Sequence, residues 1–387
     1  MTTEKPIIYL DNAATTKPFS DVLDSYNKAN EAYFGNASSV HFLGANSLNI
    51  LNKAKQQILE FLKLRNHEVI FTSGATEAIN LGIKGYCLKN QNRGKHIITS
   101  IYEHPAVSES IKQLVDLFGF EVTYLNIDKN GVVDLEQLKK SIRDDTILVA
   151  IMAANNEIGS VNNLKEISFC LSSYPKICFF SDTTQAIGKL NVEYYYCDMF
   201  VIAGHKIHGL KGTGCLIKKK NINLLPITNG GGQQDDYRSG TIDVPGCISL
   251  AKAIRLNFLK LKQNFDYVCT LRDRLLKYLD SNKEEFEINS YYDNPYIVNF
   301  SSKKHKASVI VEGLSNNGIY VSTISACHSK KEKVSNVVLA LKHDDKLASN
   351  TIRVSFSFDN TLEDVDAFIN NIKKVIEGIR QWLLTTE

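Results

Sequence analysis

Short apolar runs alternate with stretches of helical character between residues 68 and 218. Seven of these runs have the length of a strand, and they lie at residues 69–71, 96–99, 122–125, 147–151, 177–180, 200–202 and 215–217. Apolar runs separated by helices are typical of a mostly parallel sheet that is covered by helices on both faces. The sequence therefore predicts an α/β fold whose site lies where the strands end in loops.

The flanking sequence predicts further helices and a second, smaller unit. The helices are expected at residues 46–62, 110–118, 135–142, 248–279, 307–316 and 362–383, and two more strands at 296–300 and 352–356. A chain of 387 residues suits a large domain and a smaller one. We expect the large domain at 15–255 and a small α+β domain formed by 1–14 together with 256–387.

The charge and hydropathy of the chain argue against nucleic-acid and membrane partners. The formal net charge is +3 and the basic residues are dispersed, so nothing indicates a nucleic-acid partner. The lysines at 218–220 are expected to form a solvated strand end. No apolar run approaches the roughly 18 residues of a membrane span, and residues 1–5 lack the features of a signal peptide. We expect a cytoplasmic protein.

Lys206 lies between the apolar run at 200–203 and a glycine-rich turn at 209–214, directly after His205. A lysine becomes a nucleophile when burial or nearby cations lower its pKa, and it then bonds to a carbonyl or to pyridoxal phosphate. The alternative is a solvated lysine in a turn. His205 and His208 have the spacing of a metal pair, but acidic and thiol partners are missing nearby, so no metal is expected.

Residues 69–79 have the pattern of a strand, a glycine turn with hydroxyl groups and a helix start. Free backbone N–H groups and the helix dipole attract an anion at such a turn, and Thr76 adds a hydroxyl donor. This predicts a phosphate site. The alternative is that Thr76 only caps the helix.

Two further groups are placed at strand ends. Asp182 follows the run at 177–180, and a buried carboxylate at that position needs a partner such as a protonated pyridine nitrogen. His104 is placed to stack on a ring or to transfer a proton, although a loop histidine is more often structural. The polar loop at 11–18, which contains Asn12, also has the composition of a site lining.

Cys327 is the one cysteine in a polar, basic setting, because His328 and three lysines follow it. Cationic neighbours lower the pKa of a thiol and favour the nucleophilic thiolate. The alternative is an incidental exposed thiol. The other seven cysteines are expected to be small core residues, and the absence of C-x-x-C pairs argues against structural zinc and a disulfide framework.

Taken together, these stretches resemble the cysteine desulfurases, which are pyridoxal phosphate enzymes of the class V aminotransferase superfamily with the aspartate aminotransferase type fold. The likeness covers nearly the whole chain. The matching motifs are YLDNAATTKP (9–18), GNASSVH (35–41), SGATEAIN (73–80), EHPAV (103–107), NNEIGS (155–160), DTTQAIGK (182–189), GHKIHGLKGTG (204–214) and RSGTIDVPG (238–246).

The resemblance assigns a role to each matching position around the cofactor pyridoxal 5′-phosphate. It implies that Lys206 holds the cofactor covalently, that Asp182 pairs with the pyridine nitrogen and that His104 stacks on the ring. Gln185 is implied to bond the ring hydroxyl. The remaining implied cofactor contacts are Ala75, Thr76, Asn155 and His205, with Thr241 reaching across from the second subunit of a homodimer.

For the reaction, the resemblance implies that Asn155, Arg353 and Asn12 bind the substrate. A guanidinium suits a carboxylate because it donates two parallel hydrogen bonds. Cys327 is implied to take sulfur from L-cysteine as a persulfide and to release L-alanine. It lies 353 − 327 = 26 residues before Arg353. This spacing is similar to the mobile cysteine loop of group I enzymes, expected here at about 322–335, which passes sulfur to a scaffold or acceptor protein for iron–sulfur assembly or tRNA thiolation.

Several positions depart from the family pattern. Ala203 stands where a serine usually contacts the phosphate, Gln234 stands where glutamate is usual, and the triplet at 235–237 is atypical. Ala37, Leu210 and Ile324 also replace usual residues. Two other hypotheses follow. The chain could catalyse a different reaction with the same cofactor, such as transamination or selenocysteine cleavage, or it could be a degenerate binding partner in sulfur assembly.

Overall fold

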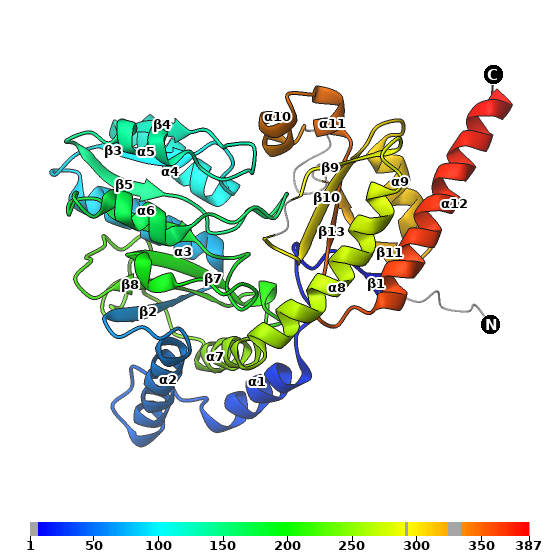
Figure 1. The fold of residues 1–387 in the computed structure, drawn as a ribbon. Helices are drawn as coiled ribbons and strands as arrows, with labels where there is room; N and C mark the ends of the chain where they lie inside the picture. The colour runs from blue at the N-terminus through cyan, green and yellow to red at the C-terminus, as the bar shows by residue number, and fades with distance from the viewer. Residues whose placement is uncertain (1–6, 291–292, 324–333, 387) are drawn as a thin grey trace.

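A seven-stranded sheet forms the larger part of the molecule (Figure 1). The computed structural model describes residues 7–290, 293–323 and 334–386. The strand order is β2-β8-β7-β6-β5-β3-β4, and only β8 runs antiparallel to its neighbours. The strands are β2 (His67–Thr72), β3 (His96–Ser100), β4 (Glu121–Leu125), β5 (Thr146–Ala150), β6 (Cys178–Asp182), β7 (Met199–Ala203) and β8 (Gly214–Lys219). The predicted mostly parallel sheet is confirmed.

Both faces of this sheet are buried, because successive side chains of each strand enter different cores. In β6, Phe179 belongs to one apolar cluster and Phe180 to the other. The two clusters lie on opposite faces of the sheet, and helices cover both. The helices of this part are α1 (Ser20–Ala32), α2 (Phe42–Phe61), α3 (Ala75–Asn90), α4 (Pro105–Phe118), α5 (Leu135–Ser141), α6 (Leu164–Leu171) and α7 (Val244–Leu259).

A four-stranded antiparallel sheet, in the order β12-β13-β10-β9, lies beside the large sheet (Figure 1). Its strands are β9 (Phe286–Ile288), β10 (Ile297–Ser302), β12 (Ser322–Thr323) and β13 (Thr351–Ser355). The N-terminal strand β1 (Ile8–Tyr9) pairs in parallel with β11 (Ile319–Tyr320). The helices of this part are α8 (Leu261–Asp280), α9 (Ala307–Ser315), α10 (Asn336–Lys342), α11 (Asp345–Ser349) and α12 (Leu362–Thr386). The domain boundaries at 14/15 and 255/256 stay a prediction.

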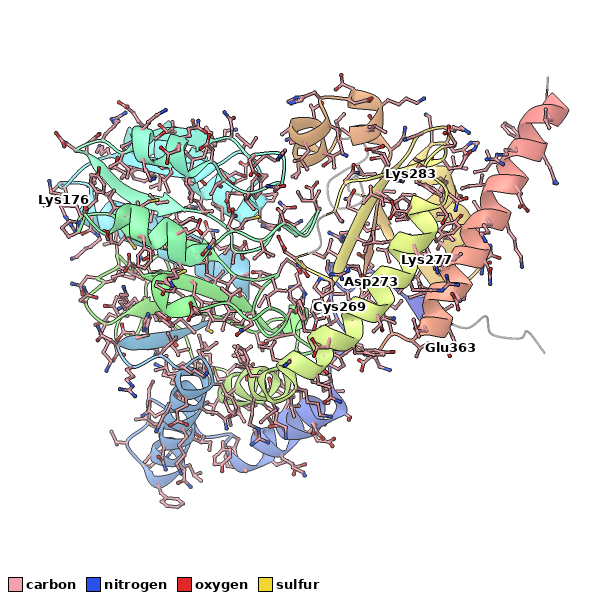
Figure 2. All side chains as sticks on the ribbon, in the orientation of Figure 1. Lys176, Cys269, Asp273, Lys277, Lys283 and Glu363 are labelled. Carbon is pink, nitrogen blue, oxygen red and sulfur yellow. The ribbon has the colours of Figure 1, made fainter. Side chains whose placement is uncertain are left out.

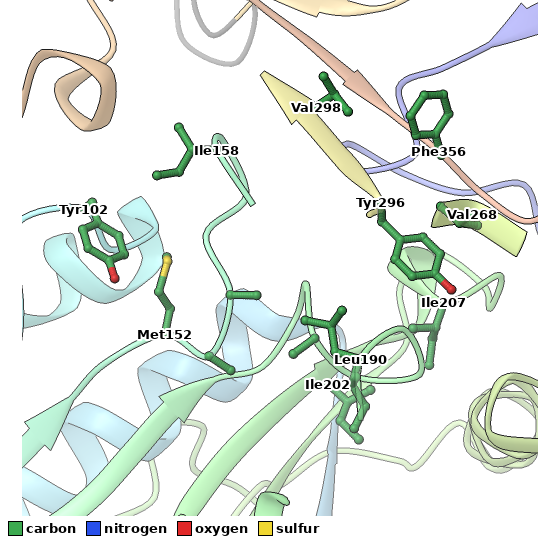
Figure 3. Close-up of a cluster of buried hydrophobic side chains, with 14 of the residues drawn as sticks. Tyr102, Met152, Ile158, Leu190, Ile202, Ile207, Val268, Tyr296, Val298 and Phe356 are labelled. Atoms are coloured by element: carbon green, nitrogen blue, oxygen red, sulfur yellow. The ribbon is translucent and has the colours of Figure 1, made fainter. Parts of the chain in front are cut away.

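One apolar cluster joins the two sheets. Figure 3 shows side chains from the large-sheet part, among them Ile202 and Ile207, and side chains from the second part, among them Val268 and Val298. A continuous core of this kind fixes the two parts relative to each other. A site between the strand ends of the large sheet and the small sheet is therefore held from both sides.

The long helix expected at 248–279 is two helices. Lys260 separates α7 from α8 with non-helical dihedral angles of φ −120° and ψ 18°. The break lets α7 pack under the large sheet while α8 runs along the small one (Figure 1). Figure 2 shows Cys269, Asp273 and Lys277 along α8. Among the described residues, no helix combines the length and the apolar character that a membrane span requires.

The expectation of a solvated lysine run at 218–220 is wrong for Lys218, whose side chain has 0% exposure. β8 is an inner strand, and its neighbour β2 is the sheet edge. The Lys218 Nζ donates to the Ile222 carbonyl at 2.7 Å and pairs with Glu68. It also lies 4.4 Å from the centre of the Tyr237 ring. Burial of the Lys218 charge is possible because a carbonyl, a carboxylate and an aromatic ring all contact the ammonium group.

Candidate active site

A cavity of about 550 Å³ lies between the carboxyl ends of the large-sheet strands and Arg353 of the small sheet. Its walls come from segments that are far apart in the sequence, including the loop at 13–15, the turn at 73–77 and the turn at 203–206. Eight of the residues predicted for the site line this one cavity: Ala75, Thr76, His104, Asp182, Gln185, His205, Lys206 and Arg353. The fold therefore brings together most of the predicted set.

Lys206 enters the cavity from a short 3-10 turn, Gly204–Lys206, directly after β7. Its Nζ donates to the carbonyls of Ala13 at 2.6 Å and Ala14 at 2.8 Å. The turn requires glycine at position 204, because a Cβ there would lie 2.2 Å from the Thr213 Oγ1. The amine is therefore placed by main-chain groups of the N-terminal loop.

His205 is half-buried beside this lysine and contacts the same loop. Its Nδ1 lies 3.2 Å from the Thr15 Oγ1, and its carbonyl accepts hydrogen bonds from the backbone N–H and the hydroxyl of Thr16. Burial, and then the charge of Lys206, lowers the pKa of His205 to about 4. The imidazole is therefore neutral near pH 7.

The glycine turn before α3 presents a helix N-terminus to the cavity. Gly74 is the N-cap residue, and no side chain caps the helix, so Thr76 lies in the first turn and is not the cap. The first N–H groups of such a helix attract anions. Close packing holds the turn, because a Cβ on Gly214 would lie 2.6 Å from the Gly74 Cα. The hydroxyl of Thr76 and the helix N-terminus together suit a phosphate group.

A half-buried ion pair between Glu77 and Arg238 supports this turn from outside. Glu77 accepts a hydrogen bond from the Ser73 backbone N–H at 2.7 Å and one from the Arg238 Nε at 2.8 Å. Burial acts to raise the pKa of Glu77, but these hydrogen bonds hold it below its ordinary value. Gln234, where glutamate is usual, bonds both the N–H and the carbonyl of Phe71 at 2.7 and 2.9 Å. An amide can make both bonds, whereas a carboxylate can only accept.

Asp182 ends β6 and is 6% exposed, and one of its oxygens accepts from the Thr184 N–H at 3.0 Å. Glu103 lies nearby, and its Oε1 accepts from the Ser100 hydroxyl at 2.6 Å and the Met152 N–H at 3.0 Å. Burial, and to a smaller extent the charge of Asp182, raises the pKa of Glu103 to about 8. Glu103 is therefore mainly protonated near pH 7, which leaves Asp182 as the negative charge.

His104 caps α4, and its Nδ1 accepts from the Ala106 N–H at 3.1 Å. The ring lines the cavity near Asp182, as the stacking role would require. Its backbone is extended and precedes Pro105, which begins the helix. The His104–Pro105 sequence therefore fixes the position at which α4 begins, and with it the position of the His104 side chain.

Gln185 and Lys189 form a buried chain that leads to Lys206. The Lys189 Nζ donates to the Gln185 Oε1 at 3.0 Å, and the Gln185 Nε2 donates to the Ala13 carbonyl at 2.9 Å. The same carbonyl accepts from Lys206. Burial, and then the charges of Lys206 and Arg353, lowers the pKa of Lys189 to about 7. Lys189 orients the Gln185 amide so that its nitrogen lies toward the loop and the cavity.

Arg353 projects from β13 into the cavity. Its Nη1 donates to the Asn156 carbonyl at 2.9 Å, and its Nη2 pairs with the Asp11 Oδ1 at 2.8 Å. The side chain is 7% exposed. A buried guanidinium with remaining N–H donors suits a carboxylate ligand.

Three predicted residues do not line this cavity. Asn12 donates to the Ser355 carbonyl and to Asn360, and Asn155 accepts from the N–H groups of Glu157 and Ile158. Thr241 is exposed and lines a neighbouring cavity of about 170 Å³, whose wall also includes Thr72 and Ser73. Their roles stay predictions. Cys327 and the predicted loop around it fall largely at 324–333, outside the described residues.

Sequence reasoning did not assign roles to Asp11 and Lys189. Both are charged residues inside motifs that were recognised, YLDNAATTKP and DTTQAIGK. A charged residue within a motif that folds into a core needs a partner. The presence of a charge inside each motif is therefore the sequence signal that indicates a role for Asp11 and Lys189. At the altered position, Ala203 lines the cavity and adds no hydroxyl.

Comparisons with known proteins agree with this geometry. Residues 8–368 match the family described as Aminotransferase class-V. A NifS/IcsS protein homolog of Lactobacillus delbrueckii subsp. bulgaricus is 39% identical, with 94% of this chain and 95% of that protein covered. Cysteine desulfurase IscS of Dictyoglomus turgidum is 36% identical, with 96% and 95% covered. A solved structure described as a NifS-like protein has a TM-score of 0.89 at 32% identity, with 96% of this chain and 100% of that chain covered.

Proposed function

This chain belongs to the class-V aminotransferase family, and on that premise we propose that it is an L-cysteine desulfurase dependent on pyridoxal 5′-phosphate. Its fold is the fold type I of these enzymes. A cysteine desulfurase is among the relatives that match nearly the full length of the chain. The observation that carries the proposal is that Lys206, Asp182, Arg353 and the N-terminus of α3 surround a single cavity.

The residues present fit the cofactor. The uncapped N-terminus of α3 with Thr76 and neutral His205 would hold the phosphate, and the buried carboxylate of Asp182 would pair with the pyridine nitrogen. Lys206 would hold the aldehyde carbon, and His104 would cover the ring. When bound, the cofactor supplies an electron sink for the substrate Cα.

In the proposed reaction, Arg353 binds the α-carboxylate of L-cysteine and so places the Cα proton near the Lys206 amine. The freed amine accepts that proton and later returns one. Neutral His205 and protonated Glu103 add no charge that would compete with Asp182. The chain's own groups would therefore bind and orient the substrate and transfer protons within one site.

The sulfur step is assigned to Cys327 by the resemblance. Its thiolate attacks the substrate sulfur and forms an S–S bond, while the Cβ–S bond of the substrate breaks. The electron pair of the broken bond stays with the carbon fragment, which is protonated and leaves as L-alanine. The product on the enzyme is a persulfide, which a scaffold or acceptor protein for iron–sulfur assembly or tRNA thiolation would receive.

The proposal includes a cytoplasmic homodimer. Thr241 is exposed on this chain, which suits a residue that contacts the cofactor of a second subunit. The seven described cysteines carry free thiols, which suits a reducing compartment.

The test is a measurement of alanine, sulfide and the visible absorbance band of the purified protein with L-cysteine. Cys327→Ala should keep the band and lose transferable sulfur, whereas Cys269→Ala, a matched change of a half-buried thiol on α8 (Figure 2), should keep both. Alanine release with selenocysteine alone, or amino-group transfer in place of alanine formation, would contradict the proposal.

A further inference from the structure

The guanidinium of Arg353 already holds a carboxylate of its own chain. Asp11 pairs with the Nη2 at 2.8 Å, and the two side chains are 20% and 7% exposed. The Nη1 is used by the Asn156 carbonyl. The Nε is buried and has no hydrogen-bond partner among the described residues. Each Nη carries two N–H groups and makes one of these contacts, and Arg353 lines the cavity, so N–H donors remain for a second carboxylate.

Backbone pairing fixes the position of Asp11. Residue 11 forms a parallel bridge with Ser355 of β13, and the Ala13 N–H donates to the Ser355 hydroxyl at 2.9 Å. Two residues further on, the carbonyls of Ala13 and Ala14 hold the Lys206 Nζ. Segment 11–14 therefore sets the spacing between the arginine and the lysine, and the Asp11 carboxylate is held at the arginine by main-chain contacts independent of their ion pair.

Other charges near Arg353 do not replace Asp11. Burial raises the pKa of Glu157, and this carboxyl accepts a hydrogen bond from the Ser335 hydroxyl at 2.6 Å. Lys189 is close enough for the charge of Arg353 to lower its pKa. Asp11 is the one acid that forms an ion pair with Arg353 among the described residues. It is therefore the acid whose charge a carboxylate bound to this guanidinium meets at the shortest distance.

We propose that Asp11 is a positioning and affinity-setting residue, whose carboxylate occupies Arg353 in the resting site and shares it with the α-carboxylate of an amino-acid ligand. The inference rests on the proposed function, in which Arg353 binds that carboxylate. Two carboxylates on one guanidinium repel each other, so Asp11 weakens the binding of substrate and product. The consequence is faster release of the product amino acid.

The experiment measures the dissociation constant of L-alanine for the cofactor-loaded enzyme by isothermal titration calorimetry. Asp11→Asn keeps the size and an oxygen acceptor for the Nη2 but removes the charge. We expect L-alanine to bind about tenfold more tightly to this variant, because one repulsive charge has been removed. Propionate has the carboxylate without the amine, and it should also bind more tightly to Asp11→Asn than to the wild type.

Asp273→Asn is the matched control, because Asp273 pairs with Arg272 at 2.8 Å on the outside of α8 (Figure 2). It should leave the dissociation constant unchanged. Asp11→Ser provides a second uncharged variant if Asp11→Asn does not fold, and thermal unfolding reports folding for each protein. Unchanged or weaker alanine binding to a folded Asp11 variant would overturn the inference.

Arg353→Gln separates failure of this inference from failure of the proposed function. If the glutamine variant binds L-alanine as tightly as the wild type, Arg353 is not the carboxylate ligand, and the proposed function is wrong at that point. If it loses alanine binding while the Asp11 variants gain nothing, the function stands and the role of Asp11 is wrong.

Discussion

The two sides of the cavity are built in different ways. On the large-sheet side, strand ends and main-chain groups place the functional atoms, as in the glycine turn before α3 and the carbonyls that hold Lys206. On the small-sheet side, Arg353 is placed by a hydrogen bond to the Asn156 carbonyl and by an ion pair to Asp11. Main-chain placement gives a fixed geometry, whereas an ion pair can be shared with a ligand. We therefore predict that changes on the cofactor side abolish the reaction, whereas changes on the substrate side alter the affinity for the amino acid.

The largest effect is expected from Lys206→Ala, which breaks the cofactor side. Loss of the amine removes both the covalent attachment and the proton acceptor, and kcat/KM should fall by about 10⁴-fold or more. The visible absorbance band should disappear after gel filtration of the variant. Turnover assays and absorbance spectra check this result.

Lys211→Ala is a matched control for that variant, because Lys211 lines the same cavity. It should keep the band, since no covalent bond depends on it. If Lys206→Ala kept a band and turnover close to the wild-type values, the assignment of the cofactor lysine would be wrong.

The cofactor side was also the more predictable of the two. The glycine turn, Asp182 and Lys206 follow directly after apolar strands, so periodicity and turn chemistry located them in the sequence. The sequence did not reveal the Asp11–Arg353 pair, because the two residues are 342 positions apart and meet only through the pairing of segment 11–14 with β13.

The local sequence pattern gives a wrong prediction in two other places, and each error has a physical reason. The sequence predicts a solvated Lys218 beside two more lysines, but β8 is an inner strand, and Lys218 has Glu68 of β2 and the Tyr237 ring as partners. The helix predicted across Lys260 is broken there, although its apolar spacing continues on both sides. Tertiary packing decided both outcomes, and periodicity carries no information on it.

Lys189→Met tests whether the two sides are coupled, because Lys189 is close to both Lys206 and Arg353. The change removes the donor to the Gln185 Oε1 and leaves a buried acceptor without a partner. Such a loss costs about 1–3 kcal/mol of folding stability. Because the Gln185 amide is then misplaced in the site, kcat/KM should fall by roughly tenfold. The absorbance band should also change shape as the Gln185 amide reorients.

Lys139→Met is the control for this variant, since Lys139 is an exposed lysine that pairs with Glu136. It should leave the spectrum and turnover unchanged. A Lys189 variant that lost stability but kept the wild-type spectrum and kcat/KM would show that Lys189 only fills space.

The smallest effect on the absorbance band is expected from Glu103→Gln, which tests how much negative charge lies around Asp182. Burial raises the pKa of Glu103 from its ordinary value of 4.5 to about 8, so the folded protein holds this proton more tightly than the unfolded chain. Its contribution to stability is complete below pH 4.5 and is lost as the pH rises towards 8. A glutamine at position 103 does not titrate, so the stability of Glu103→Gln does not fall with pH for this reason.

The free energy of unfolding should therefore fall by about 2 kcal/mol more in the wild type than in Glu103→Gln between pH 6 and pH 8. Urea unfolding at these two pH values measures the difference. Because Asp182 and Lys206 are present in both proteins, the absorbance band should be present in each. An equal pH dependence of stability in the two proteins would mean that Glu103 is ionised throughout, and the site would then carry two negative charges beside the cofactor ring.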